Sequence, residues 1–350
     1  MIMKLSEQVD FSKAFVVYKL PNTSIVRIIH QTDNKLYEDW FLETPGFYFY
    51  PYDVKENKPI VFPLNQSKSQ EFLLNSIIAF KNKNLSYEII NREQLKKEHI
   101  FKVEQAIDII KKEKSLQKLV ISSKIEIDTK NFNWENSLIN LMHNYDNALV
   151  WLWHHPSVGT WMGATPELLG AYEKNIFKTV SLAGTLPVKQ NEPLIWSTKE
   201  IQEQALVTEY IEKKLKAYAH DYKISQPQTV FQGKIAHIQS KFSSKILKDT
   251  LNKLILELHP TPAVCGLPAD KAQKYITQIE KYNRKYYTGF LGLFHPEKSY
   301  LYVNLRSMEI QDSNKISIYA GGGILENSKP DKEWHEISYK SQILISCLSE

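Results

Sequence analysis

The sequence has little cysteine and no long apolar run. Its two cysteines, Cys265 and Cys347, cannot form a disulfide framework, so we expect a protein of a reducing compartment. A membrane-spanning helix needs about 18 apolar residues. The strongest run here, ALVWLW at residues 148–153, has only the length of a strand. The first residues, MIMKLSEQVD, contain no apolar core of signal-peptide length, which predicts a cytoplasmic protein without a membrane partner.

Neither sign of charge dominates the chain. The 44 lysines and arginines exceed the 39 acidic residues by five, which mildly favours an anionic ligand. The lysines are dispersed and alternate with acids, as in KKEHIFKVEQ at residues 96–105. A nucleic-acid-binding protein instead concentrates its basic residues in a patch or stripe. We therefore expect no nucleic-acid partner.

The order of apolar patterns predicts an α+β fold in one domain, residues 1–350. Residues 1–95 contain short apolar runs separated by Pro, Gly and Asn, which indicate several strands and one helix near residues 70–81. Apolar residues spaced by three and four predict helices over residues 92–114, 199–218, 269–282 and 330–346. Alternation with period two in KLVISSKIEI, residues 118–127, predicts a strand. Further strands are expected at 148–155, 159–164, 168–175, 178–185, 300–310 and 315–321, with short strands and a helix over 219–258.

The last predicted helix carries charged residues on one face. Glu333, Glu336 and Lys340 are spaced by three and four residues, and Ile343 and Cys347 continue the same stripe. One interpretation is a solvated Glu–Lys pair, which stabilises a helix by a few tenths of a kcal/mol. The other is a face whose first half lines a polar cavity and whose second half enters a core.

A second helix raises the same question at Glu203. This carboxylate shares a stripe with Val207, Tyr210 and Ile211, although it could simply favour the positive end of the helix dipole. If it points inward it needs a cation, because an unpaired buried carboxylate is costly. Magnesium is typically held by one or two carboxylates together with substrate and water. Glu203 and Glu336 could therefore share one Mg²⁺ ion.

Two irregular segments could contribute to a site. HPTPAVCG at residues 259–266 contains two prolines, which exclude a regular helix or central strand, together with a histidine and a cysteine. It could be a metal site, a thiol nucleophile or a rigid wall. AGGGI at residues 320–324 is interpreted as a turn, which exposes successive backbone N–H groups to a ligand or merely connects a strand to the last helix.

Nine ordered motifs resemble those of the chorismate-binding enzymes, a family that includes isochorismate, salicylate, anthranilate and aminodeoxychorismate synthases. They cover residues 95–350, whereas residues 1–95 correspond to a divergent N-terminal part of the same fold. The motifs are KLVISSK (118–124), GATPELLG (163–170), SLAGTLP (181–187), KEIQEQALVTEYI (199–211), LHPTPAVCGLP (258–268), YYTGFLGLF (286–294), VNLRSMEI (303–310), AGGGI (320–324) and EWHEISYK (333–340). The resemblance implies two packed antiparallel sheets flanked by helices.

The same resemblance implies which reaction is catalysed. Aminodeoxychorismate synthase has a nucleophilic lysine where this chain has Ala183, so water or ammonia must attack the substrate directly. Lys118 stands where the water-using members have their general base, and nothing here looks like a fused glutaminase that would supply ammonia; we expect no glutaminase subunit. The implied reaction is the Mg²⁺-dependent interconversion of chorismate and isochorismate.

In that reaction the resemblance gives each residue a role. Lys118 is the base that activates water and Glu167 the acid that protonates the leaving hydroxyl. The first must have its pKa lowered by burial or nearby cations, and the second must have its pKa raised. The metal is assigned to Glu203 and Glu336, with Glu333 completing its shell. The substrate is assigned to Gly184, Thr185, Ala263, Arg306, Gly321, Gly322, Gly323 and Lys340.

The HPTPA segment then becomes a substrate-lining wall and Cys265 a small buried filler. Three features depart from the family pattern: Ser123 replaces a frequent arginine, Gln204 replaces the usual histidine after Glu203, and one extra residue lies between Arg306 and Gly321. None removes a residue assigned to the site.

Three other functions stay open at this stage. A salicylate synthase would make isochorismate and then eliminate pyruvate in the same pocket, and the motifs barely separate the two activities. A non-catalytic homologue would bind chorismate without turnover, and a nucleic-acid binder would show a steep salt dependence. We expect isochorismate for menaquinone or a catecholate siderophore, made by a monomer or a weak dimer.

Overall fold

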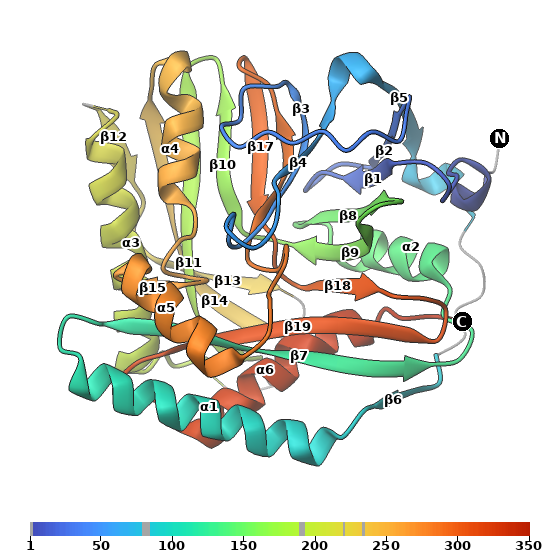
Figure 1. The fold of residues 1–350 in the computed structure, drawn as a ribbon. Helices are drawn as coiled ribbons and strands as arrows, with labels where there is room; N and C mark the ends of the chain where they lie inside the picture. Colours follow the sequence, from blue (N-terminus) through green and yellow to red (C-terminus); the bar gives the residue numbers. More distant parts are fainter. Residues whose placement is uncertain (1–2, 79–84, 189–192, 220, 233–234) are drawn as a thin grey trace.

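The computed structural model describes residues 3–78, 85–188, 193–219, 221–232 and 235–350 (Figure 1). Six α-helices lie within these residues, and short 3₁₀ helices occur at Leu5–Glu7, Leu64–Gln66, Leu74–Ser76 and Lys248–Thr250. The α-helices are α1 (Arg92–Lys112), α2 (Trp134–Asn144), α3 (Thr198–Lys216), α4 (Leu251–Leu258), α5 (Ala269–Glu280) and α6 (Pro330–Ile345). The helices predicted over 92–114, 199–218, 269–282 and 330–346 are thus confirmed.

The strands form two antiparallel sheets. In spatial order the ten-stranded sheet contains β15 (Gly266–Leu267), β7 (Lys118–Thr129), β19 (Lys315–Ile324), β18 (Ser307–Ile310), β9 (Gly159–Thr165), β8 (Leu149–His155), β1 (Phe15–Lys19), β2 (Ile25–Gln31) and β5 (Ser67–Leu73), and β6 (Tyr87–Ile89) also pairs with β7. The nine-stranded sheet contains β12 (Tyr222–Ile224), β14 (Ile235–Lys245), β11 (Ile176–Pro187), β10 (Leu168–Glu173), β17 (Lys298–Val303), β16 (Phe290–Phe294), β3 (Gly46–Tyr50) and β4 (Ile60–Pro63), and β13 (Gln228–Gln232) pairs with β14.

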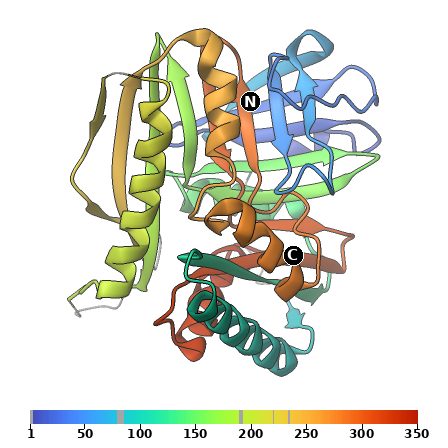
Figure 2. The same ribbon diagram turned by 60° about the vertical axis from the view of Figure 1, so that its left-hand side comes forward.

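An aromatic core joins the two sheets. Phe49 and Phe62 of the nine-stranded sheet stack on Trp153 of β8, with ring centroids 4.5 and 5.3 Å away. Large buried rings of this kind contribute much of the apolar area removed from water. The helices cover the outer faces, with α3 against β11 and β14, and with α1, α5 and α6 against β7 and β19 (Figure 2). The predicted α+β fold with two packed antiparallel sheets is confirmed.

Residues 1–95 belong to both sheets. Strands β1, β2 and β5 extend the ten-stranded sheet, while β3 and β4 extend the nine-stranded one. This part of the chain therefore packs within the same two sheets as the rest.

The predicted helix at residues 70–81 is wrong where the structure describes it, and residues 79–81 lie outside the described part. Residues 67–73 form β5, which pairs antiparallel with β2, and residues 74–76 form a 3₁₀ turn. The backbone hydrogen bonds of this edge strand come from β2, some forty residues earlier in the chain. Tertiary pairing of this kind overrides local propensity.

The predicted strand over 300–310 is two strands in different sheets. Strand β17 ends at Val303 and β18 begins at Ser307. Between them Arg306 adopts a left-handed backbone conformation, with φ of 48°. Such a conformation is uncommon for a residue other than glycine and is found where the surrounding structure enforces it. The chain thereby crosses from one sheet to the other at Arg306.

The glycines of AGGGI lie in a strand, so the predicted turn is wrong. Gly321, Gly322 and Gly323 belong to β19 and pair with Ser122, Ile121 and Val120 of β7. Successive N–H groups of an antiparallel strand point to opposite edges. Three consecutive glycine N–H groups therefore do not converge on one ligand.

Candidate active site

One cavity gathers residues from both sheets, α3 and α6. Of the predicted site residues, its lining includes Glu167, Gly184, Thr185, Glu203, Ala263, Arg306, Gly321, Gly323 and Lys340. Lys118, Gly322, Glu333 and Glu336 are not in that lining. Glu333 and Glu336 line a second, outer cavity that shares Thr185 with the first. Of the residues predicted for the metal, Glu203 therefore lines the cavity of the substrate residues, whereas Glu333 and Glu336 line the adjoining one.

Lys118 does not line the cavity but contacts Glu203, which does. Its side chain is fully buried at the start of β7, and its Nζ atom lies 3.0 Å from Glu203 Oε1. The alignment is that of an ion pair and not of a hydrogen bond, and Nζ has no hydrogen-bond partner in the described part of the chain. Burial alone would raise the pKa of Glu203, but Lys118 and Lys199 outweigh it, so that this pKa is lowered.

Gly323 makes this ion pair possible. A Cβ atom at this position would lie 2.1 Å from Glu203 Oε1 and 2.8 Å from Lys118 Cε. Both distances are shorter than real Cβ contacts allow. Strand β19 must therefore lack a side chain here for the amine and the carboxylate to meet against its backbone.

Glu167 lies in the lining next to Pro166, between β9 and β10. It is 4% exposed, and burial raises its pKa to about 7 even though Lys118, Lys340 and Arg306 lower it. A carboxyl group with such a pKa is about half protonated at neutral pH, so the form that can donate a proton is well populated. The raised pKa agrees with the environment that the sequence-based mechanism required of Glu167.

Arg306 is held by residues that the sequence analysis missed. Its Nη2 atom donates to His237 Nε2 at 3.0 Å and also contacts Gln232 Oε1. Because Arg306 can only donate, Nδ1 of His237 carries the ring proton, which it donates to the Gly184 carbonyl at 2.9 Å. Burial lowers the pKa of His237 to about 3 and that of Arg306 to about 10. No spacing or motif in the strand IAHIQSK indicated this histidine.

Three lysines balance the carboxylates of α3 and α6: Lys118, which pairs with Glu203 as described above, and two lysines that pair with Glu333 and Glu336. Lys199, also missed from the sequence, lies 2.9 Å from Glu333 Oε1 and 4.0 Å from Glu336 Oε2. Lys340 donates to Glu336 Oε1 and to the Gly321 carbonyl, each at 2.8 Å. Burial and the charge of Glu336 raise the pKa of Glu333 to about 7. The stripe on α6 thus faces a polar interior, as the second interpretation of that helix proposed. The position of Lys199 one turn before Glu203 is the signal that could have identified it.

The carboxylates suit a hard cation in their chemistry. Oxygen ligands are those that Mg²⁺ prefers, and Glu333 Oε2 is buried without a hydrogen-bond partner in the described residues. Gly322 also leaves space beside Glu336, whose Oε1 would lie 3.2 Å from an added Cβ. Within the described residues, however, no three carboxylate, histidine or cysteine side chains form a group placed to coordinate one ion. The lysine ion pairs occupy the carboxylates instead.

Two of the three departures from the family pattern have structural partners. Gln204 Nε2 lies within hydrogen-bond distance of the hydroxyls of Ser181, Thr208 and Ser240, and its contacts with Ser181 and Ser240 fasten α3 to β11 and β14. Ser123 forms a buried hydrogen bond with His99 at 3.0 Å. Gln204 therefore anchors the helix that carries Glu203.

The HPTPA segment connects α4 to β15 and contributes Ala263 and Val264 to the cavity. Cys265 is fully buried, and burial raises the pKa of its thiol to about 11. A thiol in this state is a poor nucleophile and metal ligand at neutral pH. These positions agree with the interpretation of this segment as a wall.

Comparison with known proteins gives consistent results. A family model described as "Chorismate binding enzyme" matches residues 56–349. The chain is 33% identical over 208 residues to isochorismate synthase MenF of Haemophilus influenzae, which is 57% of this chain and 48% of that protein. It is 30% identical over 281 residues to isochorismate synthase 2, chloroplastic, of Arabidopsis thaliana, or 75% and 50% of the two chains. The chain thus spans about half the length of these curated relatives.

Solved structures show the same fold. The structure titled putative 2,3-dihydroxybenzoate-specific isochorismate synthase, DhbC, from Bacillus anthracis superposes with a TM-score of 0.82 at 23% identity, over 98% of this chain and 99% of that one. MenF, the menaquinone-specific isochorismate synthase from Escherichia coli, superposes with a TM-score of 0.79 at 19% identity, over 99% and 93% of the chains. No helix in the described residues is both long and apolar enough to cross a membrane.

Proposed function

We propose that this chain, which belongs to the chorismate-binding enzyme family, is an isochorismate synthase. The reaction would add water at ring carbon 2 of chorismate, shift both ring double bonds and release the carbon 4 hydroxyl as water. One water enters and one leaves, so the overall reaction is an isomerisation. It needs a base on one side of the ring and an acid on the other.

Lys118 and Glu167 supply these two groups. Lys118 acts as the base once its ammonium group, which is ion-paired with Glu203, has given up a proton; the neutral amine then accepts a proton from the attacking water as its oxygen bonds to carbon 2. The protonated carboxyl of Glu167 donates a proton to the carbon 4 oxygen as the C–O bond breaks. General acid and base catalysis of this kind typically contributes about 10²–10⁴-fold each to a rate.

Arg306 and Lys340 hold the two carboxylates of the substrate. The Arg306 guanidinium binds the enolpyruvyl carboxylate through two parallel N–H bonds, and its orientation is fixed by His237. Lys340 adds positive charge to the lining, and Ala263, Gly184 and Thr185 form the apolar and backbone walls. Two anchored carboxylates leave the ring little freedom to rotate between acid and base.

Glu203 and Glu336 would hold a magnesium ion, with Glu333 beside them. When bound, such an ion neutralises the ring carboxylate and helps to fix the ring. Glu203 is the one of the three that lines the inner cavity, so it would hold the ion on the side of the substrate.

The observation that carries this proposal is the position of Glu203. It lies in the same cavity lining as Glu167, and it is 3.0 Å from the Lys118 amine. Acid, base and the carboxylate assigned to the metal come from three separate elements, yet they meet around one space. A chorismate-binding protein without catalytic activity would have no need of that arrangement.

A product assay tests the proposal. Purified protein is incubated with chorismate and Mg²⁺, and the products are separated by chromatography with salicylate followed by its fluorescence. The proposed function predicts isochorismate as the product, and the same equilibrium mixture when the reaction starts from isochorismate. Salicylate as the main product would assign the chain to the salicylate synthases. Binding without any turnover would make it a non-catalytic homologue.

The product would serve menaquinone or catecholate siderophore synthesis, in the cytoplasm. Similar proteins include the menaquinone-specific MenF of Escherichia coli and a vibriobactin-specific isochorismate synthase of Vibrio cholerae. Deleting the gene and supplying either menaquinone or a catecholate siderophore would separate these two uses. We retain the expectation of a monomer or weak dimer, which sedimentation velocity tests.

A further inference from the structure

Arg284 is a buried arginine that neither the motifs nor the proposed mechanism uses. It follows α5 and is 3% exposed. Its five N–H groups face five acceptors, the full capacity of a guanidinium. Nε and Nη2 donate to the two oxygens of Glu280 at 2.8 and 2.6 Å. The remaining contacts are Val264 O at 2.9 Å, Thr288 Oγ1 at 3.3 Å and Val120 O at 2.7 Å.

Three of these acceptors belong to walls of the active-site cavity. Val120, Val264 and Thr288 all line it, and they come from β7, the segment after HPTPA and the segment before β16. Arg284 itself does not line the cavity. It therefore lies behind the walls and joins three of them at one planar group.

Glu280 extends the attachment along β7. Its Oε1 atom accepts from the Ser122 N–H at 2.6 Å and from the Ser122 hydroxyl at 2.8 Å. Strand β15 pairs with β7 only at Lys118 and Leu119. Beyond that point the Val120 carbonyl and the Ser122 N–H bind Arg284 and Glu280, which take the place of a neighbouring strand.

We propose that Arg284 is a positioning residue for Lys118. It holds the backbone of β7 two residues beyond the base and sets the distance between that strand and the Ala263–Val264 wall opposite. The guanidinium is required because two carbonyls in different directions and both oxygens of Glu280 must be reached from one rigid plane. A lysine could keep the charge opposite Glu280 but has only one donor atom.

The catalytic part of this inference rests on the proposed function. The variant Arg284→Lys keeps a cation beside Glu280, so that the buried carboxylate is not left unpaired. The control is Lys19→Met, which removes another fully buried cation. Lys19 lies on β1, and its Nζ atom is 3.3 Å from Asp146 Oδ1. Strands β19, β18, β9 and β8 separate β1 from β7. The control therefore reports the effect of lost stability without a change at β7.

Two measurements are made on each full-length variant. The first is hydrogen exchange of backbone amides in the free protein, where R284K should exchange faster in residues 118–124 and 260–266 but not in 149–155. The second is steady-state kinetics well below the melting temperature. We expect kcat of R284K to fall by about 10²-fold, the effect typical of a ~1 Å misplacement, with KM for chorismate nearly unchanged. K19M should have a lower melting temperature and a wild-type kcat.

Each result is decisive for one of the two proposals. Unchanged exchange in residues 118–124, or a kcat of R284K no lower than that of K19M, would overturn the positioning role. A wild-type protein inactive toward chorismate would overturn the proposed function, while the exchange experiment would still decide whether Arg284 holds β7.

Discussion

Gly323 and Glu203 are in contact across the boundary between β19 and α3. The space that a Cβ atom of residue 323 would take is filled by the Glu203 carboxylate, 2.1 Å from the ideal Cβ position. The Lys118 side chain fills the adjoining space. The bare backbone of β19 thus serves as the surface on which these two side chains meet.

Adding a methyl group at this surface should separate the pair. We expect Gly323→Ala to reduce activity at least about 100-fold, because Glu203 and Lys118 must both move and a ~1 Å displacement costs that much. The comparison is Gly322→Ala, whose Cβ would lie 3.2 Å from the flexible end of Glu336. Its loss should be clearly smaller in the same isochorismate assay. Equal losses in the two variants would argue against the role of the Gly323 surface.

Removing the base should abolish water addition but not binding. For Lys118→Gln we expect kcat to fall by about 10²–10⁴-fold. Chorismate should still bind, and should quench the fluorescence of the variant over the same range of chorismate concentrations as that of the wild type. Lys124→Gln is the control on the same strand, since Lys124 is partly exposed and pairs with Glu126. Wild-type turnover of Lys118→Gln would remove this residue from the mechanism.

The acid role of Glu167 gives a defined pH dependence. Its pKa of about 7 means that the protonated form needed for proton donation declines as the pH rises through 7. We therefore expect kcat/KM, which reports the free enzyme, to fall on the alkaline side of that value. Glu167→Gln should lose about 10²–10⁴-fold in rate below pH 7, and the difference from the wild type should shrink as the pH rises above 7. Glu173→Gln, an exposed carboxylate of β10 paired with Lys298, should behave like the wild type.

Glu167 should also make folding stability depend on pH. Burial raises its pKa from 4.5 to about 7, so the folded state binds its proton more tightly than the unfolded state. The resulting stability is present below about pH 4.5 and is lost as the pH rises through 7. The shift corresponds to about 3 kcal/mol. We expect Glu167→Gln to gain stability relative to the wild type between pH 5 and pH 8 in urea unfolding, and a constant difference would contradict burial as the cause.

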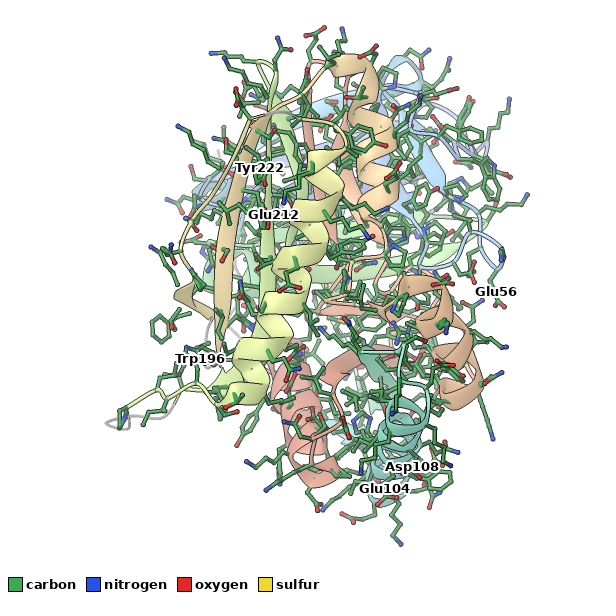
Figure 3. The ribbon with its side chains drawn as sticks, turned by 90° about the vertical axis from the view of Figure 1, so that its left-hand side faces the viewer. Glu56, Glu104, Asp108, Trp196, Glu212 and Tyr222 are labelled. Atoms are coloured by element: carbon green, nitrogen blue, oxygen red, sulfur yellow. The ribbon has the colours of Figure 1, made fainter. Side chains whose placement is uncertain are left out.

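The carboxylates assigned to the metal should control its affinity. Glu203→Ala and Glu336→Ala should each weaken Mg²⁺ binding by at least tenfold in calorimetric titrations, and chelation of the wild type should stop turnover until Mg²⁺ is restored. Glu212→Ala is the control on α3. Glu212 lies on the far part of that helix beside Tyr222, with which it forms a 2.7 Å hydrogen bond (Figure 3). Wild-type titrations of both site variants would show that the ligand assignment is wrong.

Strand β7 shows how far a local pattern reaches. Its period of two correctly predicted a strand with Leu119, Ile121, Ile125 and Ile127 on one face, and all four are buried. Lys118 and Ser122 on the other face are buried as well. The alternation could not reveal this, because the partners of these two side chains come from far along the chain: Glu203 of α3 pairs with Lys118, and Glu280 of α5 binds the Ser122 hydroxyl.

Arg306 shows the opposite case. The sequence YLYVNLRSMEI has no proline or glycine to mark an interruption, so an unbroken strand was the natural prediction. Arg306 adopts a left-handed backbone conformation at this break, and its side chain is bound by His237 and Gln232, about seventy residues earlier. Neither the break nor its two partners could be inferred locally.

Most of the helices and strands, though not β5, α2 or the break between β17 and β18, together with the nine motifs and the identity of the acidic and basic residues, follow from the sequence by itself, because spacing and side-chain chemistry are local properties. The protonation of Glu167, the pairing of Lys199 with Glu333 and the five contacts of Arg284 were decided only by the tertiary structure. These depend on how much water is excluded and on which groups from distant elements lie within hydrogen-bond reach, and both arise only when the two sheets and their helices pack together.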